Sequence, residues 1–156
     1  TKEKMFQAVF GSIVSSVVPK VFDALTHKEK SISQRVEGII DAYYALFLEN
    51  PQLPMFMLRE LNRDSDLLIN TIQQFNVMDT VHNALASVQE EMNEGKLRKV
   101  SLQFTFYNFY SLLTFPFLTK DISTKVFRND DKAFRAMLVE WKQNIIAQML
   151  NLLEVK

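Results

Sequence analysis

The chain has 156 residues, with 18 Lys and Arg against 18 Asp and Glu, and it contains no cysteine. The length is typical of one domain, and the balanced, dispersed charge offers no basic face for nucleic-acid phosphates. The lack of cysteine excludes disulfides, thiolate metal sites and a cysteine nucleophile, and it suits a reducing compartment. We therefore expect a single cytoplasmic domain that does not bind DNA by itself.

Residue usage favours helices. Only three Gly and four Pro are present, too few for the turns of a many-stranded sheet. Strong helix formers are plentiful. Thirteen Phe, seven Met and four Tyr provide many large apolar side chains for a core or a pocket. The sequence predicts an all-α fold, a single helical bundle of about six helices.

The first predicted helix spans residues 2–25, where apolar side chains recur at helical spacing. Pro19 falls inside this pattern. Because proline lacks an N–H group and its ring clashes with the preceding turn, it should bend or break the helix there. Pro19 is therefore a candidate hinge, and residues 26–30 form a charged loop.

Two further helices have clear signals at their ends. Ser31 and Gln34 have the spacing of a capping box, so the second helix begins there, and Asn50-Pro51 ends it. Pro54 suits the first turn of a short third helix over residues 55–61.

Residues 62–66 form a polar loop that also caps the next helix. That fourth helix is predicted as one unbroken element over 66–93, because apolar residues advance by three or four throughout, and Gly95 ends it. Residues 101–118 then form a helix that is apolar on most of its circumference.

The segment 100–118 has about the length of a membrane span. Polar residues recur along it, so a buried helix explains the pattern better, and no membrane association is expected. After a polar loop, the last helix begins at Asn129 or Asp130, with the negative charge of Asp131 in its first turn.

Three stretches carry a resemblance. Residues 1–6 (TKEKMF) are similar to the start of a helix that links a DNA-binding head to a helical body. The sequence FLENP at 47–51, followed by MLREL at 57–61, has a helix, an Asn-Pro break and a short Arg-Glu helix in order. The sequence EGKLR at 94–98 precedes two final helices. In this order, the stretches resemble the C-terminal region of TetR-family transcriptional regulators over essentially the whole chain.

The resemblance implies a homodimer whose last two helices pair with those of its partner as a four-helix bundle. It also implies a cavity in each subunit for a small apolar or amphipathic effector. DNA would be bound only through an N-terminal helix-turn-helix domain, which is absent from this chain. Independently, the final helix and its apolar neighbour carry more apolar surface than a monomer of this size readily hides, which favours self-association.

The helix over 101–118 should present two different faces, because residues three and four apart share a side. One face carries Phe106, Phe109, Tyr110 and Leu113, and the other carries Phe104, Asn108, Ser111 and Phe115. One face suits a pocket and the other a partner. We prefer the first as the pocket, because the second includes small residues that let helices approach closely.

Other candidates complete the two surfaces. The remaining predicted pocket residues are aromatic, sulfur-containing or titratable: Tyr43, Tyr44, Phe47, Phe56, Met57, Phe75, Met78 and His82. The remaining predicted interface residues form the stripe of the last helix: Phe134, Leu138, Trp141, Ile145 and Met149. His82 could instead be an ordinary core histidine, and the aromatic residues could be ordinary packing. Arg59 and Glu60 are interpreted as a solvated pair rather than a ligand anchor.

No catalytic constellation is recognisable, since the chain has no nucleophile elbow, phosphate-binding glycine loop or paired histidine and nucleophile. The two histidines have no metal-ligand spacing. We expect no enzyme activity, no cofactor and no metal. Two alternatives to a regulator remain, a helical carrier of hydrophobic ligands and a purely structural dimerisation module.

Overall fold

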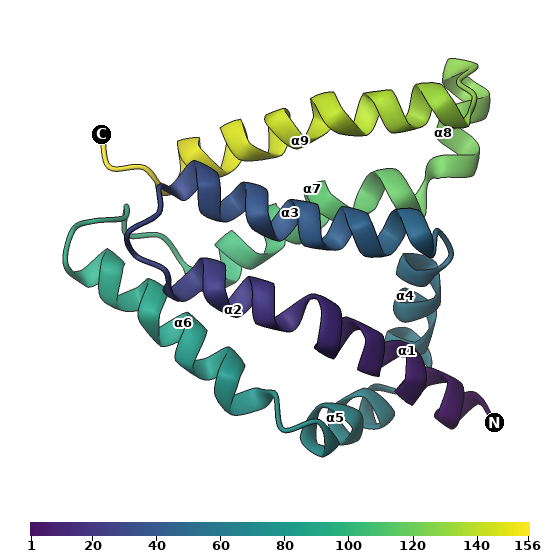
Figure 1. Ribbon diagram of the computed structural model, residues 1–156, viewed down its shortest axis with the longest axis horizontal. Coiled ribbons are helices and arrows are strands. Elements are labelled where there is room, and N and C mark those ends of the chain that lie inside the picture. The colour runs from purple at the N-terminus through teal and green to yellow at the C-terminus, as the bar shows by residue number, and fades with distance from the viewer.

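The computed structural model describes all residues from Thr1 to Lys156 and consists of α-helices joined by short connections (Figure 1). The prediction of an all-α fold is confirmed. The helices are α1 (Lys2–Ser16), α2 (Val18–Thr26), α3 (Ile32–Glu49), α4 (Leu53–Arg63), α5 (Ser65–Gln74), α6 (Met78–Asn93), α7 (Leu102–Leu118), α8 (Lys120–Phe127) and α9 (Asp131–Leu153).

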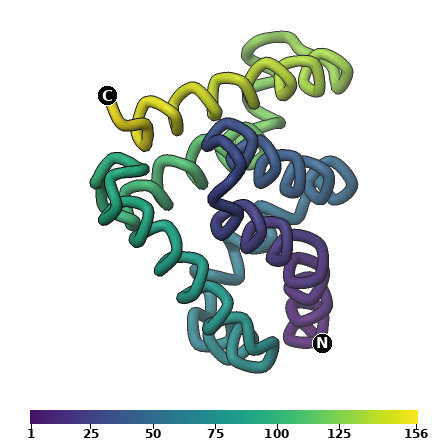
Figure 2. Tube along the Cα trace, turned by 60° about the vertical axis from the view of Figure 1, so that its left-hand side comes forward, coloured from purple at the N-terminus to yellow at the C-terminus, as the bar shows by residue number.

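The core lies where α9 packs against α3 and α7. Ile40, Leu113, Leu138 and Ile145 meet there and are almost completely buried. Around this centre, α2 packs on α3 and α6, while α1 packs on α2, α3 and α5, and α4 packs on α5 and α7. Figure 2 shows the resulting arrangement, in which α1 and α5 extend away from α9 at the opposite side of the molecule.

The predicted capping signals are present. The Ser31 hydroxyl accepts a hydrogen bond from the Gln34 backbone N–H at 3.2 Å, and the Gln34 side chain accepts one from the Ser31 N–H at 3.0 Å. Pro54 lies in the first turn of α4, where no intrahelical N–H is needed. Gly95 adopts a φ of +75° directly after α6, as a helix-ending glycine does.

The predicted break in the first segment is confirmed, slightly before the proline. The helix is interrupted at Val17, and Pro19 lies in the first turn of α2. Val17 is fully buried, so the interruption sits inside the fold rather than at its surface.

By length and composition alone, the segment Lys2–Thr26 is apolar enough to cross a membrane. In the fold it is divided at Val17 and packs against α3, α5 and α6. Buried helices of globular proteins and N-terminal signal sequences meet the same compositional criterion, so this single segment is weak support for a span.

Two sequence expectations about helix boundaries are wrong. The segment 66–93 is not one helix but two, because Asn76 adopts a left-handed conformation with φ of +53° between α5 and α6. The expected polar loop after α7 contains the short helix α8. With the division at Val17, these differences raise the number of helices above the six expected.

Candidate ligand cavity and association surface

A cavity of about 140 Å³ lies among α2, α3, α6, α7 and α9. Twelve of its thirteen lining residues are hydrophobic, so the space is suited to an apolar molecule. The lining residues are Val21, Leu25, Val36, Ile39, Leu85, Val88, Leu102, Thr105, Phe106, Phe109, Tyr110, Met149 and Leu153.

The cavity has a deep wall and an open edge. Met149 is 2% exposed and Phe109 is 7% exposed, and both belong to the main core. In contrast, Leu85 of α6 is 38% exposed and Phe106 of α7 is 55% exposed. The cavity therefore communicates with solvent between these two helices.

Polar groups are few in the lining, and all of them are uncharged. The Tyr110 hydroxyl lies 2.6 Å from that of Tyr43, and the two rings meet edge to face. Burial raises the pKa of Tyr43 well above its usual value and also raises the pKa of Tyr110, so both phenols stay neutral. The Thr105 hydroxyl donates to the Ser101 carbonyl at 3.0 Å.

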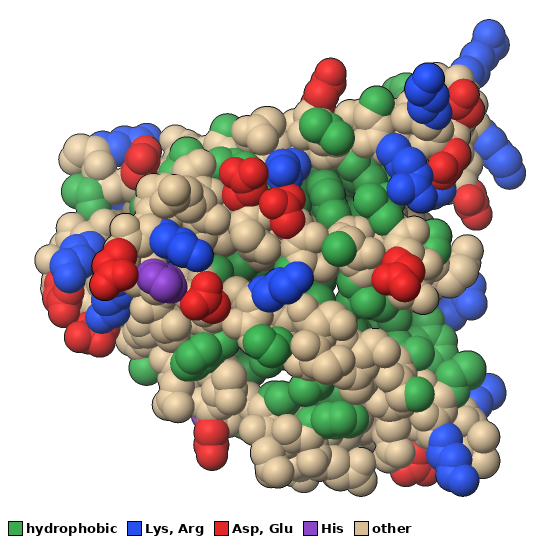
Figure 3. Space-filling view, in the orientation of Figure 1, with side chains coloured by type: hydrophobic (Ala, Val, Ile, Leu, Met, Phe, Trp, Pro, Cys, Tyr) green, Lys and Arg blue, Asp and Glu red, His purple; other side chains and the backbone are tan.

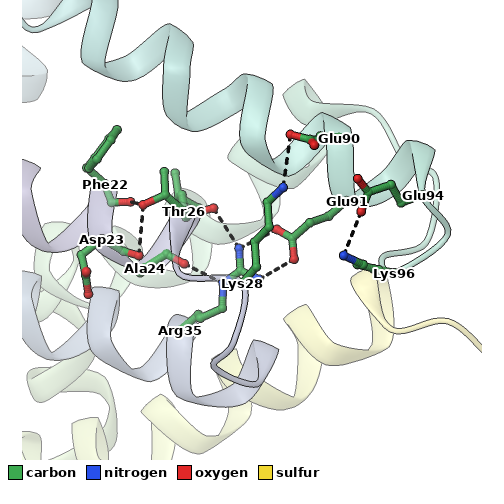
Figure 4. Close-up of polar contacts among 11 residues, drawn as sticks. Phe22, Asp23, Ala24, Thr26, Lys28, Arg35, Glu90, Glu91, Glu94 and Lys96 are labelled. Atoms are coloured by element: carbon green, nitrogen blue, oxygen red, sulfur yellow. Dashed lines mark hydrogen bonds and ion pairs between the residues drawn. The ribbon is translucent and has the colours of Figure 1, made fainter.

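A buried ion pair fixes one end of α6 beside the cavity (Figure 4). The Arg35 guanidinium donates to both Glu91 carboxylate oxygens at 2.9 and 2.8 Å. It also donates to the carbonyls of Ala24 at 2.6 Å and Leu25 at 2.9 Å. One side chain thus ties together the end of α2, the start of α3 and the end of α6.

Sequence reasoning missed this ion pair, although the chain carries a signal for it. Arg35 falls four residues before Ile39 on the buried side of α3, and Glu91 falls three after Val88 on the buried side of α6. Each of these charged residues occupies a helix position that the spacing places on the buried side. Two such residues on different helices indicate a buried ion pair, because a lone buried charge is too costly.

The predicted pocket residues separate into groups. Phe106, Phe109 and Tyr110 line the cavity, and Tyr43 contacts it through the Tyr110 hydroxyl. Three others fill the adjoining core instead. Leu113 is fully buried, and the rings of Tyr44 and Phe47 lie 5.6 and 5.1 Å from that of Phe117.

The remaining predicted pocket residues lie away from the cavity lining. Phe56 packs against Phe6 and Phe75 packs against Phe10, both on α1, while Met57 is partly buried beside the core. Met78 and His82 are exposed on α6. Both lie in the N-terminal half of α6, whereas the cavity is lined by Leu85 and Val88 further along the same helix.

The two faces of α7 are separated as the spacing predicts. Phe104, Asn108, Ser111 and Phe115 all point outward, with 63% and 61% of the two phenylalanines exposed. The opposite face carries the cavity-lining residues already described. The outward face is thus largely exposed to solvent.

The predicted interface stripe on α9 faces inward instead. Phe134, Leu138, Ile145 and Met149 are buried in the chain's own core, and Met149 lines the cavity. Trp141 is half-buried, and its indole N–H donates to the Leu112 carbonyl at 2.8 Å. The apolar stripe of an amphipathic helix is the side that becomes buried. The chain's own α3 and α7 bury the stripe of α9.

Exposed apolar residues also occur on α8, which was expected to be a loop. Ile122, Val126 and Phe127 are each at least 64% exposed, as is Val139 on the outer side of α9. Together with the outward face of α7, these residues form what we call the outer apolar surface. Its outward side chains on α7 and α8 are Phe104, Phe115, Ile122, Val126 and Phe127.

Arg59 and Glu60 do not pair with each other. Glu60 is buried and accepts hydrogen bonds from Arg63 one turn later, while Arg59 is exposed. The expected solvated pair is therefore corrected to a partly buried pair between Glu60 and Arg63.

Charged groups elsewhere are dispersed. Lys and Arg are interspersed with Asp and Glu on the face shown in Figure 3. No group of three or more His, Asp or Glu side chains converges to hold a metal ion. No family model, curated protein or solved structure matches this chain.

Proposed function

We propose that this chain is the effector-binding and homodimerisation domain of a TetR-type transcriptional regulator. The observation that carries the proposal is the apolar cavity between α6 and α7, whose lining includes Val21 and Leu25 of α2. An occupant of the cavity touches the helix that continues, through Val17, into the N-terminal helix α1. A bound molecule can therefore bias the position of the segment to which a DNA-binding head attaches.

The outer apolar surface supports the dimer part of the proposal. Soluble monomers rarely leave so many large apolar side chains uncovered on adjoining helices. Asn108 and Ser111 on α7 are small and exposed, which allows close helix approach. On this proposal α7 and α9 pair with the same helices of a second copy, with the outward sides of both helices at the interface.

The hinge is placed at Val17 and Pro19. A ligand shifts an equilibrium only when it has different affinities for the two states, so an element that can adopt two positions is required. Pro19 lacks the N–H that would bond the preceding turn, so the helix is interrupted here, between α1 and the cavity.

Light scattering on this chain tests the dimer. The expected mass is twice the 18.2 kDa of one chain. The double change Phe104→Glu and Phe115→Glu should give a monomer, because it places charge at the centre of an apolar interface. Val155→Glu is the matched control, since Val155 is an exposed apolar residue beyond α9 and should leave the dimer intact.

The gene and the whole protein test the regulator. A helix-turn-helix coding region upstream of Thr1 agrees with the proposal, and a signal peptide or a start codon there contradicts it and favours the hydrophobic carrier. In the whole protein, Pro19→Ala should weaken the change in operator affinity caused by an effector. An unchanged response removes Pro19 from the mechanism.

A further inference from the structure

We infer that the cavity between α6 and α7 takes a small uncharged molecule, of the size of a substituted benzene with one hydrogen-bond acceptor, and discriminates against ions of the same shape. This inference rests on the proposed function, because it names the chemical class of the effector for the same site.

Volume sets the size of the ligand. The cavity measures about 140 Å³, close to the roughly 150 Å³ of an engineered apolar protein cavity that stays dry and binds benzene. Drug-sized ligands usually occupy roughly 300 Å³ or more. Leu85 and Phe106 are half-exposed at the edge, which gives such a ligand a route into the cavity.

The lining sets the charge of the ligand. It contains no Lys, Arg, His, Asp or Glu. Arg35 lies directly before the lining residue Val36, but its guanidinium is already bonded to Glu91 and to two backbone carbonyls. A carboxylate or ammonium group inside the cavity would thus lose its hydration without gaining a counter-ion.

Tyr110 sets the polar feature of the ligand. The hydroxyls of Tyr43 and Tyr110 make one hydrogen bond with each other, which uses one of their two protons. Neither hydroxyl has another partner. Tyr110 belongs to the lining and Tyr43 does not. When Tyr43 donates to Tyr110, the Tyr110 proton has no acceptor within the chain, and we expect a carbonyl or ether oxygen of the ligand to supply one.

Methyl NMR on the intact chain tests this inference with three ring compounds of matched size. The probes are acetophenone, which is neutral and has a carbonyl acceptor, benzoate, which is an anion, and benzylammonium, which is a cation. With methionine methyl groups labelled, Met149 reports on the cavity and Met5 reports on a separate groove among α1, α3 and α4. Acetophenone should shift the Met149 signal but not that of Met5, with an affinity at least about tenfold above either ion.

Variants locate the binding. Leu85→Trp fills the edge of the cavity from a half-exposed position and should remove the Met149 response to acetophenone, and Val88→Phe should do the same from a deeper position. Ile69→Trp is the control, because Ile69 is exposed on α5 outside the lining and outside the outer apolar surface. Tyr110→Phe should weaken acetophenone binding severalfold, since the free donor is lost. The circular dichroism of each variant verifies its helix content.

Two results overturn the inference. Benzoate or benzylammonium binding at Met149 as tightly as acetophenone contradicts the uncharged class. A Met149 signal that none of the three probes shifts, up to their solubility limits, contradicts a site for small ring compounds. Either result leaves the mass measurement and the upstream gene sequence to decide the proposed function separately.

Discussion

The core between α3, α7 and α9 is much more completely enclosed than the packing of α5 and the first half of α6. In the bundle, Ile40, Leu113 and Ile145 are all fully buried. In the layer of α5 and α6, large apolar residues are 37–49% exposed: Ile69, Phe75, Met78, Val81 and Leu85. The cavity lies at the border, where Leu85 of the layer faces lining residues of the bundle such as Phe109 and Met149. This difference gives the site a rigid wall and an adaptable one, since local opening follows sparse burial.

The two ends of α6 repeat this contrast within one helix. At its C-terminal end, Glu91 is paired with Arg35 and Met92 is 1% exposed. At its N-terminal end, Met78 and His82 face solvent, and no side chain caps the helix. A ligand that enters beside Leu85 therefore meets the part of α6 that is least restrained.

Removing the anchor of α6 should have the largest effect. In Glu91→Ala, Arg35 stays buried without its partner, which should lower the free energy of unfolding by about 3–5 kcal/mol. Urea unfolding followed by circular dichroism measures the loss. Lys96→Ala breaks the exposed ion pair with Glu94 near the same helix end and should cause no resolvable change. Equal losses in both variants would contradict a buried anchor.

Truncating one leucine in each region compares the two walls directly. Leu113→Ala should cost about 2–5 kcal/mol, because Leu113 is fully buried and the enclosed bundle collapses poorly around a cavity. Leu85→Ala should cost about 1 kcal/mol or less, since this side chain is already partly solvated. The same urea titrations measure both values. Similar losses would show that α6 is packed as tightly as α7.

Local patterns predicted much of this fold. The capping box at Ser31 and Gln34 and the stop at Asn50-Pro51 depend on neighbouring residues, so the sequence alone reveals them. The two faces of α7 follow from helical spacing for the same reason. The roles of these faces as pocket and partner surface stay predictions.

Features that depend on distant residues were not predictable in this way. Arg35 and Glu91 are 56 positions apart, and only the packing of α3 near α6 brings them together. Asn76 is not a glycine, so its left-handed conformation left no clear mark in an otherwise continuous helical pattern. Met149 belongs to the apolar stripe of the last helix, and helical spacing does not say whether a partner or the chain itself covers that stripe.

Alkaline pH probes the enclosed region through Tyr44. Burial raises the pKa of Tyr44 to about 12, and its hydroxyl has no hydrogen-bond partner. The folded state favours the neutral phenol. The contribution of Tyr44 to the free energy of unfolding is therefore fully present below pH 10. It is lost as the pH rises from about 10 to 12, by about 1.4 kcal/mol per pH unit at most. Tyr44→Phe should lack this loss and cost little at neutral pH.

The measurement is the free energy of unfolding of wild type and Tyr44→Phe at several pH values from 9 to 11. Lysines titrate in both proteins, so the difference between the two curves isolates Tyr44. Tyr107→Phe, at an exposed tyrosine, is the control and should follow wild type. Parallel curves for wild type and Tyr44→Phe would show that Tyr44 ionises without opening the bundle.

Two helical glycines provide the finest comparison. A methyl group at Gly38 of α3 meets no atom within 4 Å, so Gly38→Ala should raise the free energy of unfolding by about 0.5–1 kcal/mol through helix propensity alone. A methyl group at Gly11 of α1 comes within 3.3 Å of the Phe75 ring, so Gly11→Ala should raise the free energy of unfolding by a smaller amount. In a protein that already carries Phe75→Ala, Gly11→Ala should raise the free energy of unfolding as much as Gly38→Ala does, since the obstructing ring is gone. If Gly11→Ala already stabilises wild type as much as Gly38→Ala does, the Phe75 ring moves aside freely, and the layer beside the cavity is more adaptable than its contacts with Phe10 indicate.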